Sequence, residues 1–295
     1  MRTLRRAILA TMFRLAAALL LALCLAPPAR ATLAAIAPAR DGLVIAADSR
    51  LTFMGAHCDG AFKVLLPARP ARTVAIVTGD SFFVAPPPPR THDLCRYLAT
   101  APRLLDIGAV VTQTLERGSG SAAQISVNAL AQACVDAVER FQASHPQALR
   151  EYAGKEIFSV TVAGYDPASA TSTLRNFVVR GLANTGTLQI RADRLTTVTI
   201  TPASARGIWI YGESDWVNRN VYAGAGRRFL SSAALRFLSQ RATVAATSRA
   251  EAVAAARNVI AAAGRTTALL PAPSGIGGTI RVVVLNRGPR PSVLP

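Results

Sequence analysis

From residue 32 onward, the pattern of apolar and polar positions alternates between the two-residue period of strands and the 3.6-residue period of helices. Two short apolar segments flank a turn at Gly42, so we expect the domain to open with a β-hairpin. The strands predicted in this way are 32–38, 42–48, 73–79, 157–166, 173–181, 207–215 and a final strand within 273–288. The helices predicted in this way are 91–100, 124–143, 226–241 and 248–263.

Local signals sharpen parts of this pattern. The "SRAE" segment, Ser248 to Glu251, is typical of a helix N-cap with a reciprocal glutamate. The "APPPPR" segment at 85–90 predicts a loop, since consecutive prolines do not fit a central strand or a helix interior. The order of strands, helices, strands, helices and strand predicts an α+β fold, with two mainly antiparallel sheets face to face and helices outside. This arrangement is a four-layer αββα sandwich in one domain.

The first 31 residues differ from the rest. A basic start, an apolar run of about a dozen residues and a closing Ala29-x-Ala31 form the three parts of a secretory signal peptide. The apolar run is short for a bilayer span, although an uncleaved anchor is the alternative. Cleavage after Ala31 by signal peptidase would make Thr32 the first residue of the mature protein. We therefore expect a periplasmic or secreted protein, by the general or the twin-arginine export route.

The charge of the chain is strongly positive. The formal net charge is +17, and removal of residues 1–31, which carry five arginines and no acid, lowers it to +12. The basic residues are scattered singly and form no run, so a nucleic-acid partner is not expected. Only two of the 33 basic residues are lysines, Lys63 and Lys155.

The number of cysteines indicates whether the mature chain contains a disulfide. The predicted mature chain holds Cys58, Cys95 and Cys134, an odd number for an oxidising compartment. One disulfide and one buried free thiol are the favoured interpretation, with the pairing left open. A metal site built from the cysteines with His57 and His92 is the alternative, but the spacing matches no zinc pattern, so we expect no metal or cofactor.

The opening of the predicted mature chain resembles proteasome β-subunits and, more widely, the N-terminal nucleophile (Ntn) hydrolases. Thr32 is followed sixteen residues later by "DSRLT", residues 48–52, as in that family. Lys63 lies within one residue of the family's lysine, and "VTGD" around Gly79 is similar to the family's turn. Further segments support the likeness in order, namely 125–133, 160–166, 173–181 and 273–285. The resemblance implies an Ntn-type sandwich over 32–288, with 1–31 as signal peptide and 289–295 as a C-terminal tail.

The resemblance also implies the roles of particular residues. Thr32 would be the nucleophile, with its free α-amine as base, because a threonine hydroxyl needs a base within hydrogen-bond reach. Lys63, held by Asp48, would lower the pKa of that amine. The Gly79 N–H would stabilise the oxyanion. The remaining residues implied by the family are Ser214 and Ser274 in the hydrogen-bond network, Arg50 as structural support, and Leu51, Ala61 and Val77 in an apolar substrate pocket.

The chain also departs from the family's pattern. The residue before the threonine is Ala31 instead of glycine, and Pro271 stands where the closing loop of the family has aspartate. The predicted function is an exported threonine peptidase acting on peptides or small amides, with homo-oligomeric rings as the family's habit. The alternatives are an amidase or acylase on a non-peptide amide, and a catalytically inactive binding or assembly protein of the cell envelope.

Overall fold

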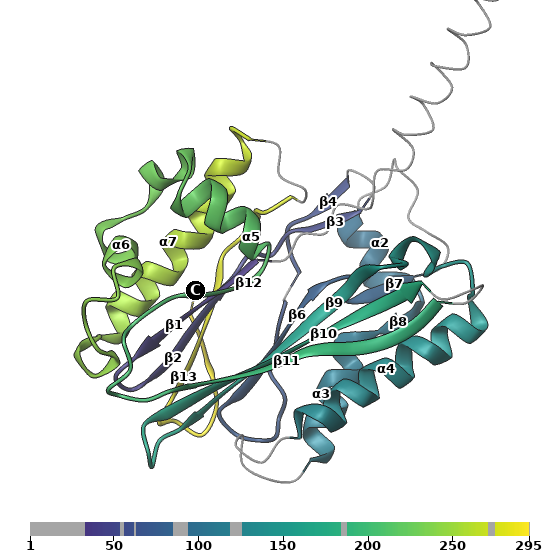
Figure 1. Ribbon diagram of the computed structural model, residues 1–295, viewed down its shortest axis with the longest axis horizontal. Helices are drawn as coiled ribbons and strands as arrows, with labels where there is room; N and C mark the ends of the chain where they lie inside the picture. The colour runs from purple at the N-terminus through teal and green to yellow at the C-terminus, as the bar shows by residue number, and fades with distance from the viewer. Residues whose placement is uncertain are drawn as a thin grey trace, which may run out of the picture.

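The fold is built on two five-stranded sheets that face each other (Figure 1). The computed structural model describes residues 33–53, 56–61, 63–84, 94–118, 126–183, 188–270 and 275–294. One sheet has the order β12-β1-β2-β13-β14, with the bounds Trp209–Gly212, Leu33–Ala39, Gly42–Ala47, Arg281–Asn286 and Ser292–Leu294. The other has the order β11-β10-β9-β6-β5, with the bounds Leu188–Ile200, Thr171–Ala183, Lys155–Asp166, Thr73–Gly79 and Val64–Leu65.

Smaller elements complete the chain. Two short hairpins are formed by β3 (Leu51–Phe53) with β4 (Ala56–Cys58) and by β7 (Phe82–Val84) with β8 (Arg103–Asp106). The α-helices are α2 (Leu94–Thr100), α3 (Ile107–Arg117), α4 (Val127–Ser144), α5 (Ser214–Val217), α6 (Ser232–Leu238) and α7 (Arg249–Thr267). Single turns of other helix types are η2 (Arg150–Tyr152), η3 (Asn218–Tyr222), η4 (Ala225–Phe229) and η5 (Val244–Ala246).

Three apolar clusters hold these elements together. Between the sheets, Ile36 and Ile45 of the first sheet pack with Ile76 of the second. The other face of β1 packs with α6 and α7, and the other face of β9 packs with α3 and α4. Both sheets are therefore covered on both faces, with helices on the two outer sides (Figure 1). This double burial is the reason why β1 and β2 are apolar almost throughout.

Much of the predicted secondary structure is confirmed, and the α+β class with it. The opening hairpin pairs β1 with β2 around Gly42, and β6 has the predicted bounds Thr73–Gly79. The Ser248 side chain accepts the N–H of Glu251, whose own side chain accepts the N–H of Ser248, so α7 begins with a capping box. The predicted proline loop at 85–90 lies outside the described residues, as does the predicted signal peptide.

Two predicted elements are wrong in extent. The continuous helix over 226–241 is instead η4 followed by α6, because the Ser231 side chain accepts the Ala234 N–H and starts a new helix there. The strand over 207–215 is shortened to β12, which ends at Gly212 with a φ of 92° before α5 begins.

The structure also contains elements that the hydrophobic pattern missed, above all α3 and β11. In α3 the buried residues Ile107, Val111 and Leu115 are spaced by four, and Asp106 caps the helix. β11 is a largely exposed edge strand in which only Ile190 and Ile200 are buried. Residues 292–294, assigned to a C-terminal tail, form β14 beside β13. In the part of the chain described here, no helix is long and apolar enough to cross a membrane.

Candidate active site

A buried ion pair lies at the end of the first sheet. Asp48 follows β2 directly, and its Oδ1 accepts a hydrogen bond from Lys63 Nζ at 2.9 Å. The same oxygen accepts the backbone N–H of Leu33 at 2.8 Å. The two charged side chains are 0% and 4% exposed, for aspartate and lysine respectively. The pair therefore lies beside the first described residue of β1, which follows Thr32 in the sequence.

Burial acts on both charges of this pair. It raises the pKa of the Asp48 carboxyl, with Lys63 acting in the opposite direction. It lowers the pKa of the Lys63 ammonium, again opposed by the partner. The two charged forms are therefore sustained by each other and by the backbone donors around the carboxylate.

The glycine-rich loop before β13 closes over the same carboxylate. Gly277 donates its N–H to Asp48 Oδ2 at 3.4 Å and accepts the N–H of Arg50 at 3.1 Å. A side chain at Gly277 would overlap the Arg50 guanidinium, with a Cβ only 2.7 Å from its Cζ. At Gly278, where φ is 76°, a Cβ would lie 2.6 Å from Ser49 Oγ. Close packing therefore explains both glycines.

Arg50 and Asp59 tie the β3–β4 hairpin to this loop. The guanidinium donates from Nε and Nη2 to the two Asp59 carboxylate oxygens, at 2.6 and 2.8 Å. This hydrogen bond lowers the pKa of Asp59. Ser49 Oγ donates to the Asp59 carbonyl, and Ala61 N donates to the Ser49 carbonyl at 3.1 Å. Arg50, predicted to give structural support, therefore joins the end of β2 to the turn after β4.

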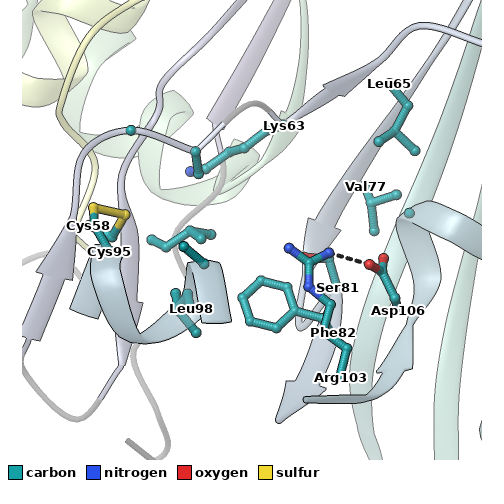
Figure 2. Close-up of a pocket in the computed structure, with 15 residues that line it drawn as sticks. Cys58, Lys63, Leu65, Val77, Ser81, Phe82, Cys95, Leu98, Arg103 and Asp106 are labelled. Carbon is teal, nitrogen blue, oxygen red and sulfur yellow. Dashed lines mark hydrogen bonds and ion pairs between the residues drawn. A yellow bond between two sulfur atoms is a disulfide. The ribbon is translucent and has the colours of Figure 1, made fainter. Parts of the chain in front are cut away.

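A cavity of about 340 Å³ opens next to Lys63 (Figure 2). Leu51, Ala61 and Val77, the residues expected to line a substrate pocket, all lie on its wall. Further apolar groups come from Leu65 and Leu98. The structure therefore brings together three residues from three separate segments of the chain around one cavity.

A disulfide forms part of the cavity wall. Cys58, on β4, is bonded to Cys95, on α2, and both line the cavity. The sequence left open which two of the three cysteines are bonded, and the structure pairs Cys58 with Cys95. Cys134 is a free and buried thiol on α4. Within the described residues, no group of three histidine, cysteine or acidic side chains could hold a metal.

Gly79 is the last residue of β6, and Ser214 follows the end of β12. Gly79 ends β6 with a φ of 87°, and a Cβ there would lie 2.6 Å from the Ile157 carbonyl oxygen. Val77 and Ser81, on either side of it in sequence, line the cavity. Ser214 begins α5, two residues after Gly212, which is paired with Leu33 across β12 and β1. Ser214 therefore lies near the start of β1, and Gly79 lies between two residues of the cavity wall.

Two of the predicted site residues cannot be placed. Thr32 and Ser274 lie outside the described residues, so the structure adds nothing to their predicted roles. The described part of the site is a buried cation held by an anion, a rigid glycine turn and a cavity. Together they could lower the pKa of an amine and accommodate a side chain next to it.

Sequence reasoning missed several groups in this site. Asp59 was not singled out, although it follows Cys58 directly and pairs with Arg50. Arg103 and Asp106 were also missed, and they form an ion pair on the cavity wall. The signal for Asp106 was present as an N-cap before Ile107, but helix α3 itself was not predicted.

Comparisons with known proteins give a distant likeness. No protein-family model matches the chain. No curated protein matches it. Among solved structures, an Anbu (Gly-1) mutant from Hyphomicrobium sp. strain MC1 is 14% identical, with 90% of this chain and 85% of that chain covered and a TM-score of 0.44.

Two other solved structures give similar values. The helical assembly of the Anbu complex from Pseudomonas aeruginosa is 14% identical, with 89% of this chain and 85% of that chain covered and a TM-score of 0.46. Anbu (ancestral beta-subunit) from Yersinia bercovieri is 12% identical, with 86% and 81% covered and a TM-score of 0.42.

These findings correct the family assignment. The prediction that the chain is an exported member of the proteasome β-subunit-like Ntn hydrolases is wrong as stated, because no family model matches and the matched structures are Anbu proteins.

Proposed function

We propose that the protein is an exported amidohydrolase, a threonine peptidase whose nucleophile is Thr32 after removal of residues 1–31. One observation carries the proposal. The buried carboxylate of Asp48 binds both the Lys63 ammonium and the N–H of Leu33, the residue after Thr32. A fixed positive charge is thus held beside the position where cleavage would create a free amine.

The chemistry follows from that placement. An N-terminal amine has an ordinary pKa of about 8, and a nearby cation lowers it, so the amine is neutral and can act as a base. The amine takes the proton of the Thr32 hydroxyl while the oxygen attacks the substrate carbonyl carbon. The proton then passes to the leaving amine, and the C–N bond breaks. Water hydrolyses the resulting ester and regenerates threonine.

The rest of the proposed site supports this step. The N–H of Gly79 would donate to the oxyanion, and a side chain cannot be accommodated at that position. Ser214 and Ser274 would complete the hydrogen bonds around the amine. The cavity beside Lys63 would take the substrate side chain next to the bond that is cleaved. The succession of helices, two sheets and helices would form a four-layer αββα sandwich that supports these groups.

The test begins with intact mass and N-terminal sequencing of the protein from its native compartment, before and after treatment with a β-lactone. The proposal expects a chain that starts at Thr32 and gains one adduct. It expects no adduct in Thr32→Ala and a much slower reaction in Lys63→Met. Lys155→Met is the matched control, because Lys155 is exposed and remote in sequence from the site.

Other outcomes would overturn the proposal. A chain that keeps residues 1–31 would have no free threonine amine and would point to a binding or assembly protein of the envelope. A chain that starts at Thr32 but gains no adduct would also point to a binding or assembly protein. If the adduct forms but no peptide is cleaved, a non-peptide amide becomes the substrate class. Light scattering on the same sample measures whether the protein forms a homo-oligomer.

A further inference from the structure

The cavity beside Lys63 contains a polar group that an apolar substrate pocket does not require. Arg103, on β8, and Asp106, at the start of α3, form an ion pair on its wall (Figure 2). The Arg103 guanidinium also lies over the Phe82 ring, 5.2 Å from its centroid. Arg103 is therefore held in place from two sides, by a charge and by an aromatic face.

The hydrogen-bonding capacity of Asp106 is used within the protein. Its Oδ1 accepts the N–H of Ala109 at 3.0 Å and caps α3. Its Oδ2 accepts a hydrogen bond from Arg103 Nη1. Both oxygens therefore already accept a hydrogen bond from the protein, and the charge of Asp106 is paired with that of Arg103.

The Arg103 guanidinium has more N–H donors than its ion pair with Asp106 uses. A guanidinium carries five N–H groups, and Asp106 is its hydrogen-bond acceptor among the described residues. The side chain is 48% exposed, so its remaining donors are accessible. In Figure 2 one guanidinium nitrogen faces Asp106 and another faces the interior of the cavity. The first turn of α3 adds positive potential on the same wall, through Gly108.

We propose that Arg103 determines specificity by binding substrates whose side chain in this cavity ends in a carboxylate or carboxamide oxygen. Leu65, Val77 and Leu98 would contact the aliphatic stem of such a side chain. The Arg103 donors would bind its terminal oxygen. The apolar preference expected from Leu51, Ala61 and Val77 then applies to the stem and not to the tip. This inference rests on the proposed function and names the substrate class of the same site.

The test uses peptide β-lactones that are identical except for a glutamate, glutamine or leucine side chain next to the reactive group. Rates of adduct formation on the mature protein are measured by intact mass. We expect the glutamate and glutamine probes to react about tenfold faster than the leucine probe, the effect of one charge-assisted hydrogen bond. Arg103→Met should reduce that preference to within about twofold.

Two further variants make the test specific. Asp106→Asn keeps an oxygen for the α3 cap but removes a negative charge near the bound tip, so the ratio of glutamate to glutamine rates should rise. Arg117→Met removes an exposed arginine at the far end of α3 and should change no rate ratio. A second measurement, calorimetric binding of matched unreactive peptides to Thr32→Ala, reports on the cavity without the reaction.

The outcomes separate the two proposals. A leucine preference in the unmodified protein, or a glutamate preference that survives Arg103→Met, overturns the role of Arg103. Binding that discriminates the peptides without any adduct supports Arg103 and overturns the proposed hydrolase. If the peptides neither bind nor form an adduct, both proposals are overturned.

Discussion

The Asp48 carboxylate and the Lys63 ammonium form a 2.9 Å ion pair that is almost completely buried. Removing two charges from water is costly, and their attraction offsets that cost only when further hydrogen bonds satisfy both groups. The N–H of Leu33 supplies one of these bonds, from the start of the first strand. The ion pair therefore links the strand end after β2 to the residue that follows the proposed nucleophile.

Breaking this ion pair should destabilise the fold. Lys63→Met leaves the Asp48 carboxylate buried without a countercharge, which costs about 3–5 kcal/mol. The free energy of unfolding in urea measures this loss. The matched control is Lys155→Met, the exposed second lysine, whose expected effect is within about 0.5 kcal/mol. Adding Asp48→Asn to Lys63→Met should restore part of the loss. Equal effects of the two lysine substitutions would contradict the burial argument.

Gly79 should tolerate no side chain. Gly79→Ala introduces a left-handed backbone strain and a Cβ within 2.6 Å of the Ile157 carbonyl oxygen. Gly154→Ala is the control, since its φ of 73° carries a similar strain but no atom lies within 4 Å of the added Cβ. Gly154→Ala should lower the free energy of unfolding, measured by thermal denaturation, by about 1 kcal/mol. Gly79→Ala should lower it clearly more. A smaller loss at Gly79 than at Gly154 would show that the β6 turn can shift.

The Arg50–Asp59 pair should contribute to stability at neutral pH and not in acid. Arg50 lowers the pKa of Asp59 below its ordinary value of 3.8, so the carboxylate stabilises the folded state above that value. The contribution is lost as the pH falls through the folded pKa. Asp59 is 46% exposed, so Asp59→Asn should cost under about 1 kcal/mol at pH 7.

That cost should become smaller when unfolding in urea is followed well below pH 3.8 instead of at pH 7. Asp215→Asn is the control, because Asp215 is an exposed carboxylate that forms no ion pair among the described residues. A constant cost for Asp59→Asn at both pH values would mean that the side chain acts through packing instead of charge.

The Cys134 thiol should be unreactive in the folded protein. Burial raises its pKa to about 12, so the thiolate is scarce at pH 8, and the sulfur is inaccessible as well. Ellman's reagent should therefore detect no thiol in the native mature protein. In denaturant without reductant it should detect one thiol, because Cys58 and Cys95 are bonded.

The same titration tests whether residues 1–31 have been removed. A chain that retains them carries Cys24 and should give one additional thiol in denaturant. Reduction before denaturation should add the two thiols of the disulfide. A reactive thiol in the native mature protein would mean that α4 opens more readily than its packing indicates.

The sequence by itself determined the elements whose burial is strongest. The strands β1, β2 and β6 lie in the interior, so nearly every position must be apolar, and their bounds were predicted closely. The capping box of α7 was also readable, because it depends on residues three positions apart. The edge strand β11 was missed because most of its positions are exposed, whereas α3 was missed although its buried residues recur every four positions.

For the candidate site as well, some residues could be predicted from the sequence and some contacts only from the tertiary structure. Asp48, Lys63 and the pocket residues were proposed from the sequence through a resemblance whose family assignment proved wrong. Only the tertiary structure decided that Gly277 and Leu33 donate to the same carboxylate, that Cys58 bonds Cys95, and that Arg103 reaches the cavity. These contacts join segments that are far apart in the chain, and no local periodicity specifies which distant segments meet. The hydrophobic pattern fixes what is buried, whereas the packing of the two sheets and their helices decides which polar groups meet at the edge.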